Sequence, residues 1–161
     1  IWRGPMETSA IKTFTQKVEW KNLDFIVVDM PPGTGDTQLT FAQEIKMDGV
    51  IIVSTPQELA LQDVKRGIAM FDKLNVNIIG LVDNMSYFLG DDGKKYSIFG
   101  GGGVKRTAEE FNKIFLGEIP INSDVGKFGD QGMPIVEKDP DNEISKIFIE
   151  LATKVKKIYL S

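Results

Sequence analysis

The sequence predicts an α/β fold, a mostly parallel sheet with helices on both faces. Two observations support this prediction. Short apolar runs of strand length alternate with longer segments whose apolar residues recur at helical spacing. The apolar runs are continuous, which is typical of strands buried on both faces of a parallel sheet. Strands joined by crossover helices in this way give a sheet covered by helices on both sides.

The predicted elements follow from this alternation. We expect strands at 23–29, 49–55, 76–84 and 114–120, and helices at 6–18, 36–46, 57–74, 104–113 and 141–159. Residues 85–103 are expected to be irregular, with a tight hairpin turn at 91–95. A loop containing Gly126, Gly129, Gly132 and Pro134 is expected after the last strand.

Length and composition set limits on function. The chain has 161 residues, a net charge of −4, and neither cysteine nor histidine. The length suits a single domain over residues 1–161. The acidic balance argues against a nucleic-acid partner, and no apolar run approaches the ~20 residues of a membrane span. Without cysteine and histidine, these residues cannot form disulfides, thiolate metal sites or a Cys or His nucleophile. The absence of cysteine also fits a reducing compartment, so we expect a cytoplasmic protein.

The predicted strand ends should line one ligand-binding rim, because ligands of such sheets bind beyond the carboxyl ends of the strands. These ends are Asp29, the stretch Ser54-Thr55-Pro56, Asn84 and Pro120.

The stretch FIVVDMPPGTGD (25–36) carries the strongest single signal. Asp29 ends an apolar run, where an aspartate would hold Mg²⁺ through water. Gly33 follows at a spacing that lets a glycine N–H approach a γ-phosphate. The alternative for Asp29 is a carboxylate that caps the next turn.

The segment from Gly33 to Asp36 would form a mobile switch that senses the γ-phosphate. Within it, Asp36 would position the attacking water. The alternative, N-cap of the following helix, is equally favoured, and both roles are compatible.

Two further strand ends are candidate base contacts. The Asn84 amide offers one donor and one acceptor, which match the edge of adenine, although an isolated asparagine more often forms an Asx-turn. Backbone groups after Pro120 could hold the adenine ring, and the alternative is a simple strand terminator.

Two other patterns are assigned no chemistry. The glycine run 100–103 is not followed by Lys-Ser/Thr at phosphate-loop spacing, and it follows a hairpin rather than a buried strand. It is interpreted as a flexible approach to a helix. Asp91 and Asp92 are interpreted as solvated charges in a turn.

Six stretches together resemble one family. They are WRGPM (2–6), VVDMPPGTGDTQLTFAQ (27–43), STPQELALQDVKRGIAMF (54–71), VDNMSYF (82–88), IFGGGGVKRTAEE (98–110) and LGEIPINSDV (116–125). They span nearly the whole chain. The chain is similar to the Mrp/ApbC ATP-binding iron–sulfur cluster carriers, relatives of MinD and of nitrogenase iron protein.

The resemblance implies a MinD-like, SIMIBI-type P-loop NTPase fold of which these residues form the C-terminal part. It implies a slow, Mg²⁺-dependent ATPase that binds ATP or ADP, dimerises around nucleotide, and carries a [4Fe–4S] cluster to apo iron–sulfur proteins. On this basis Asp29 resembles the Mg²⁺-site aspartate and Gly33 the switch glycine. Asn84 and the loop residues Pro120, Ile121 and Asn122 resemble the adenine contacts.

Two departures from the family pattern stand out. The family's GKGGVGKS-type loop lies upstream of WRGPM, where this sequence begins, so we expect this chain alone to bind ATP poorly and to be inactive. The family often carries C-P-x-C after NMSYF, where this sequence has Gly90, Asp91 and Asp92. Carboxylates are poor substitutes for thiolate ligands of a cluster.

Two alternatives to a cluster-carrying ATPase remain open. One is a nucleotide-switched dimeric scaffold without a cluster. In it the 141–159 helix, with Lys154, Lys156 and Lys157 beside Ile158 and Leu160, docks on a partner or a membrane surface. The packing of this helix on the sheet is the simpler interpretation, and we expect no membrane association. The other alternative is an inactive fragment.

Overall fold

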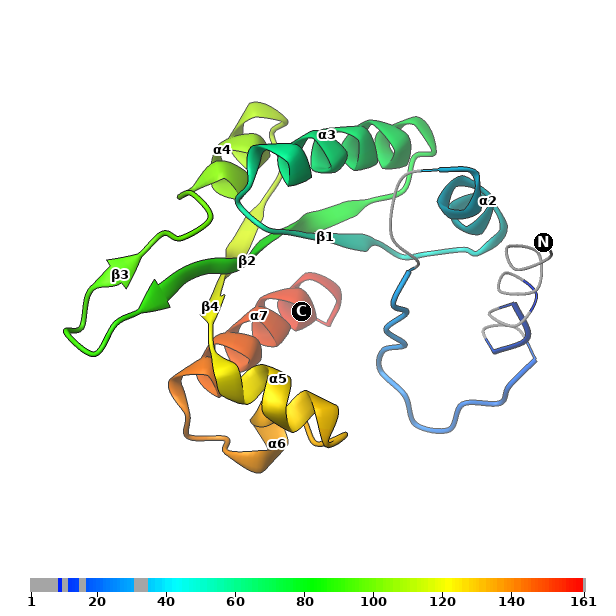
Figure 1. The fold of residues 1–161 in the computed structure, drawn as a ribbon. Helices are drawn as coiled ribbons and strands as arrows, with labels where there is room; N and C mark the ends of the chain where they lie inside the picture. Colours follow the sequence, from blue (N-terminus) through cyan, green and yellow to red (C-terminus); the bar gives the residue numbers. More distant parts are fainter. Residues whose placement is uncertain (1–8, 10–11, 15–16, 31–34, 161) are drawn as a thin grey trace.

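The computed structural model describes residues 9, 12–14, 17–30 and 35–160, without the side chains of residues 36 and 37. Its helices are α2 (Asp36–Glu44), α3 (Glu58–Lys73), α4 (Gly103–Glu110), α5 (Ser123–Asp130), α6 (Ile135–Lys138) and α7 (Glu143–Tyr159). Its strands are β1 (Val50–Ser54), β2 (Ile78–Leu89), β3 (Lys95–Tyr96) and β4 (Phe115–Ile121) (Figure 1).

The sheet is built around β2. It pairs in parallel with β1 along one edge and in parallel with β4 along the other. Beyond β1 on the same edge, β2 pairs antiparallel with the short β3, so that Phe88 lies between Tyr96 and Ile121. The mostly parallel α/β sheet predicted from the sequence is therefore confirmed.

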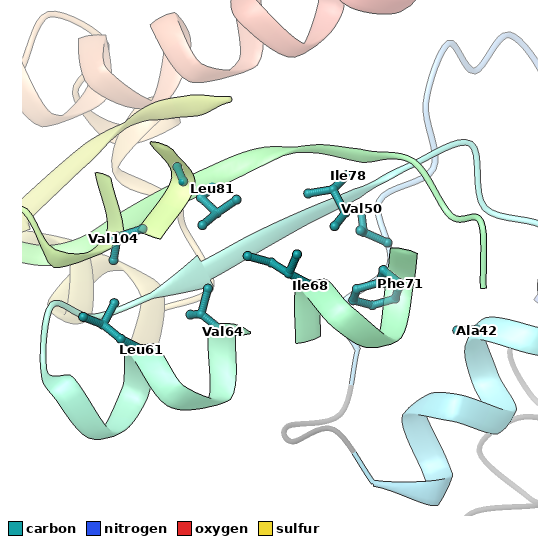
Figure 2. Close-up of a cluster of buried hydrophobic side chains, with 10 residues drawn as sticks. Ala42, Val50, Leu61, Val64, Ile68, Phe71, Ile78, Leu81 and Val104 are labelled. Carbon is teal, nitrogen blue, oxygen red and sulfur yellow. The ribbon is translucent and has the colours of Figure 1, made fainter. Parts of the chain in front are cut away.

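One face of the sheet is covered by α3 and α4 (Figure 1). The periodic apolar positions of α3 insert Leu61, Val64, Ile68 and Phe71 into a cluster with residues of β1, β2 and α4 (Figure 2). Ile68 of α3 and Leu81 of β2 are both fully buried in it. Burial of this face fixes the positions of β1 and β2 relative to each other.

The opposite face is covered by α7. Ile79, Val82, Leu116 and Ile119 form its buried part, and apolar residues of α7 pack against them. Two polar contacts fix the helix further: Lys154 Nζ donates to the Leu116 carbonyl at 2.8 Å, and the Tyr159 hydroxyl donates to the Asp48 carbonyl at 3.0 Å. The interpretation of 141–159 as a terminal helix packed on the sheet is confirmed. Among the helices in the described part of the chain, none is long and apolar enough to cross a bilayer.

The predicted strand 23–29 is wrong for this structure. Residues 25–30 have no regular secondary structure, and the Val27 side chain is 92% exposed. A strand forms only where a neighbour completes its hydrogen bonds. No described strand lies beside these residues.

Two further predictions need correction. The glycine-containing segment after β4 is not a loop, because Ser123–Asp130 and Ile135–Lys138 are helical. The Asn122 side chain caps the first of these helices and so offsets the cost of its glycines. The third strand is longer than predicted, since β2 continues through Leu89 into the hairpin, and the turn predicted at 91–95 is confirmed.

A substitution in the α3 layer tests this packing. We expect Ile68→Ala to lower the free energy of unfolding by about 2–5 kcal/mol, because it leaves a cavity in a fully buried position. The measurement is urea denaturation followed by circular dichroism. Leu59→Ala on the same helix is the matched control: its side chain is 77% exposed, so a change below about 0.5 kcal/mol is expected. Equal losses in both variants would contradict the assigned face of α3.

Candidate functional site

The carboxyl ends of the three parallel strands meet at one rim. Ser54 of β1 is in register with Asp83 of β2, and Asp83 is in register with Glu118 of β4. The next pair is Asn84 and Ile119. The rim predicted from Ser54, Asn84 and the end of the 114–120 strand is therefore brought together by the sheet.

Asp83 is the residue of this rim that sequence reasoning missed. Its side chain is only 1% exposed, and its Oδ1 atom has no hydrogen-bond partner among the described residues. Burial, followed by the nearby Glu118 carboxylate, raises the pKa of Asp83 from 3.8 to about 6. The signal was visible in the sequence as an acidic residue inside the apolar run VNIIGLVDN.

Asn84 makes a local contact. Its Oδ1 accepts from the Met85 N–H at 3.0 Å, and Met85 has a φ of 53°. This hydrogen bond reaches only the next residue, whereas an Asx-turn accepts from the N–H two residues on, so it is not the Asx-turn that the sequence offered as the alternative to a base contact. The half-buried side chain keeps its amide N–H groups without a partner among the described residues, so one side of the amide stays available.

The β2–β4 ladder is interrupted after Asn84, where the register shifts before Phe88. Here the buried Ser86 hydroxyl donates to the Ile119 carbonyl at 3.1 Å. This hydrogen bond holds the two strand ends together where ladder bonds are missing, and it keeps Asn84 beside the end of β4.

The end of β4 differs from the prediction in one respect. Pro120 lies inside β4 and does not terminate it, since Ile121 still belongs to the strand. Proline is tolerated because β4 pairs with a described strand on one edge only. Asn122 follows, and its Oδ1 accepts from the Asp124 N–H at 2.8 Å as the N-cap of α5.

The switch segment is described only in part. Asp29 is exposed, and the described contacts do not join it to Asn84 or to residues 120–122. Gly33 lies outside the described residues. The N-cap of α2 is Gly35 rather than Asp36: the Gly35 N–H donates to Gln38 Oε1 at 2.9 Å, and Asp36 is the first helical residue. The alternative prediction, that Asp36 is the N-cap of this helix, is therefore wrong by one position.

The glycine run 100–103 serves packing. Gly102 is the N-cap of α4 with a φ of 66°, in the left-handed region that favours glycine. A Cβ on Gly103 would lie 2.6 Å from Leu61 Cδ1 and 3.1 Å from the Pro56 carbonyl. The run therefore lets α4 approach the start of α3 closely.

Asp92 organises the hairpin turn. Its carboxylate accepts from the Lys94 N–H at 3.0 Å and from the Tyr96 hydroxyl at 2.9 Å. The Lys94 N–H, followed by the Tyr96 hydroxyl, lowers the pKa of Asp92. Within the described part of the chain, no group of three or more acidic, histidine or cysteine side chains could hold a metal ion.

Comparison with known families decides the assignment. The family model described as "ParA: NUBPL iron-transfer P-loop NTPase" matches residues 1–156. The chain belongs to this family. Its relatives include an iron-sulfur cluster carrier protein of Aquifex aeolicus, 45% identical over 94% of this chain. They also include an iron-sulfur protein required for NADH dehydrogenase, mitochondrial, of Arabidopsis thaliana, 47% identical over 98% of this chain. The chain spans 42% and 50% of the length of these two relatives.

Solved structures support the fold. A nucleotide-binding protein of Archaeoglobus fulgidus in complex with ADP superimposes with a TM-score of 0.73 and 38% identity, over 84% of this chain and 56% of that protein. The cell division ATPase MinD of Pyrococcus furiosus gives a TM-score of 0.70 at 21% identity, over 96% of this chain and 59% of that protein, which shows the fold alone. The predicted MinD-like P-loop NTPase fold is confirmed.

We predict that the buried Asp83 makes the stability of this chain depend on pH. Because its folded pKa is raised, the folded protein binds more protons than the unfolded chain between about pH 4 and 6. The free energy of unfolding should therefore fall as pH rises through this window, by at most roughly 3 kcal/mol from this group. We expect Asp83→Asn to match the unaltered protein at pH 4 and to exceed it in stability at pH 7.5.

Urea denaturation at both pH values measures this effect. Asp91→Asn, which removes an exposed carboxylate, is the control and should leave the pH profile nearly unchanged. If the free energy of unfolding changed with pH in the same way for the unaltered protein and Asp83→Asn, ionisation of the buried Asp83 carboxyl would not destabilise the fold, and the prediction would be wrong.

Proposed function

We propose that these residues form the γ-phosphate switch and the adenine-binding part of an ATP-binding, Mg²⁺-dependent ATPase that acts in iron–sulfur cluster assembly. The observation that carries the proposal is membership of a family of iron-transfer P-loop NTPases over residues 1–156. Three parallel strands of the chain end at one rim, which is where such sheets bind their ligands.

In this proposal, Asp29 holds Mg²⁺ through water. Its exposed carboxylate in a segment without regular structure is compatible with binding an ion from solvent. The Gly33 N–H would contact the γ-phosphate, and Asp36 would orient the attacking water. Mg²⁺ neutralises the charge that develops on the phosphate oxygens during transfer.

The adenine base of the nucleotide would lie between the ends of β2 and β4. Asn84 keeps amide hydrogens for the base, and the Ser86 hydroxyl holds this strand end against Ile119. Backbone groups of Pro120 and Ile121 would contact the ring. Asn122 contributes mainly by starting α5, because its side-chain oxygen already caps that helix.

A cluster would be the cargo of this protein, and these residues alone do not fit it as ligands. The chain has no cysteine and no histidine, and Asp91 and Asp92 stand in the hairpin turn. Asp92 is already engaged by Lys94 and Tyr96. The cluster ligands must therefore come from outside these 161 residues, either from the rest of the polypeptide or from an apo iron–sulfur protein.

The same absence favours a second candidate function, a nucleotide-switched dimeric scaffold whose output is partner binding. Cluster transfer discriminates between the two. Delivery of a reconstituted cluster to an apo-ferredoxin by the complete polypeptide supports the carrier, and nucleotide-dependent association without any bound iron supports the scaffold.

Nucleotide binding is the first test. We expect this chain alone to bind Mg·ATP weakly in calorimetric titration, because it contains no G-x-x-x-x-G-K-[ST] loop to cradle the phosphates. A polypeptide that joins these residues to such a loop should bind in the micromolar range. Low-micromolar binding of Mg·ATP by the 161-residue chain would contradict the inference that its nucleotide site needs a phosphate loop from elsewhere.

The role of Asp29 is tested in the loop-containing polypeptide. Asp29→Asn should lower the steady-state rate of ATP hydrolysis at least about tenfold, because the Mg²⁺ shell loses its charged partner. Asp24→Asn is the matched control, since Asp24 is an exposed acid in the same irregular segment. Equal rates of ATP hydrolysis for Asp29→Asn and Asp24→Asn would show that Asp29 does not hold the Mg²⁺.

A further inference from the structure

A bulge in β2 shapes the part of the rim that carries Asn84. Asn84 is in register with Ile119, but the register shifts before the next pair, so residues 85–87 of β2 stand opposite Pro120 alone. Bulges are common beside binding sites, where the extra residues change the direction in which a side chain points. The direction of the Asn84 amide therefore depends on how this bulge is held.

Two hydrogen bonds hold the bulge. The Ser86 hydroxyl, on a residue that is only 5% exposed, donates to the Ile119 carbonyl at 3.1 Å. The Met85 N–H donates to Asn84 Oδ1 at 3.0 Å, and the Met85 backbone has a φ of 53°. A residue other than glycine keeps a left-handed backbone only where its surroundings hold it there. The turn from Asn84 to Ser86 is thus fixed at both ends.

The orientation of the Asn84 amide follows from the chemistry of its contact. A backbone N–H can only donate, so the amide atom that faces Met85 must be the oxygen. The Nδ2 group has no acceptor among the described residues and is the part of the amide that can still bind a ligand. The sequence predicted one donor and one acceptor for the base at Asn84, but the fold engages the acceptor and leaves the donors.

This orientation decides which atom of a base Asn84 can contact. In the bidentate contact of asparagine with adenine, the amide N–H meets N7 and the amide oxygen meets the N6 amine. We propose that Asn84 donates to N7 of a purine ring and does not contact the N6 amine of adenine. Because N7 is an acceptor in adenine and guanine alike, this contact selects purines and leaves the choice between them to other groups. The inference rests on the proposed function and adds how the base is recognised.

Ser86 is the positioning residue for this contact. Its hydroxyl supplies a bond between β2 and β4 in the stretch where the ladder is interrupted. Without that hydroxyl, the Ile119 carbonyl loses its donor, and an acceptor left without a partner is costly where it is buried. The bulge is then expected to rearrange, and the Asn84 amide to lose its direction.

Nucleotide analogues test the contact in the loop-containing polypeptide. The first probe is 7-deaza-ATP, which has carbon in place of N7 and keeps the N6 amine. Calorimetric titration should give a Kd about fivefold higher for this analogue than for ATP, both with Mg²⁺, because one hydrogen bond is lost. Asn84→Ala should bind the two nucleotides equally. A preference for ATP that persists in Asn84→Ala would overturn the proposal.

Inosine triphosphate tests the other half of the proposal. It keeps N7 but carries a carbonyl oxygen in place of the N6 amine. Because Asn84 does not contact that amine, Asn84→Ala should leave the ratio of the affinities for ATP and inosine triphosphate unchanged. A fall in this ratio would show that the amide oxygen binds the N6 amine, and the proposal would be wrong.

Serine variants test the positioning role. Ser86→Ala should lose the preference for ATP over 7-deaza-ATP, and Ser86→Thr, which keeps a hydroxyl, should retain it. Ser145→Ala is the matched control, because the buried Ser145 hydroxyl also donates to a backbone carbonyl, that of Ile135, but between α6 and α7. It should lower stability without changing the preference. A preference retained by Ser86→Ala, with circular dichroism showing that it is folded, would refute the role of Ser86.

The outcomes separate this inference from the proposed function. If the unaltered loop-containing polypeptide does not bind Mg·ATP, both are wrong. If it binds Mg·ATP and 7-deaza-ATP equally well, the N7 contact is wrong and the proposed ATP site stands. The Asn84→Ala titrations decide the inference even where Ser86→Ala does not fold.

Discussion

The structure depends on the burial of β2 on both faces and along both edges. Two separate apolar clusters meet on this strand: Ile78 and Leu81 belong to the α3 side, and Ile79 and Val82 to the α7 side. Parallel neighbours occupy its two edges. The hydrophobic effect therefore dominates the placement of β2, and the strand ends at the rim are positioned by their pairing with β2.

Polar side chains follow the buried apolar residues of β2 near the carboxyl end of its parallel pairing. Asp83 carries a buried carboxyl with an unpartnered oxygen, and the next residue, Asn84, starts a local turn at Met85. A buried polar group without a partner costs stability. An apolar or amide residue would stabilise the isolated chain more, so the carboxyl at this rim is a feature that packing alone does not explain.

The site is divided between what these residues hold and what they do not. They contain the strand-end rim, Asn84, Asn122 and the Asp29 segment, but neither a G-x-x-x-x-G-K-[ST] loop nor any cysteine or histidine. The chain spans only 42% to 50% of the length of the two relatives compared above. Among the residues that the structure describes, β1 pairs along one edge only, and the segment 25–30 pairs with no strand.

The sequence by itself determined the fold class, the family and the part of the rim formed by Ser54, Asn84 and the end of β4. Continuous apolar runs define buried strands locally, and the six family-like stretches span nearly the whole chain. Whether residues 23–29 form a strand was decided only by tertiary structure, because a strand exists only when a neighbour supplies its ladder. The glycine-containing helix at 123–130, by contrast, starts from a local cap, since the Asn122 side chain accepts from the Asp124 N–H. Burial of Asp83 was likewise decided by packing, since an acidic residue in an apolar run shows its environment only after the layers close around it.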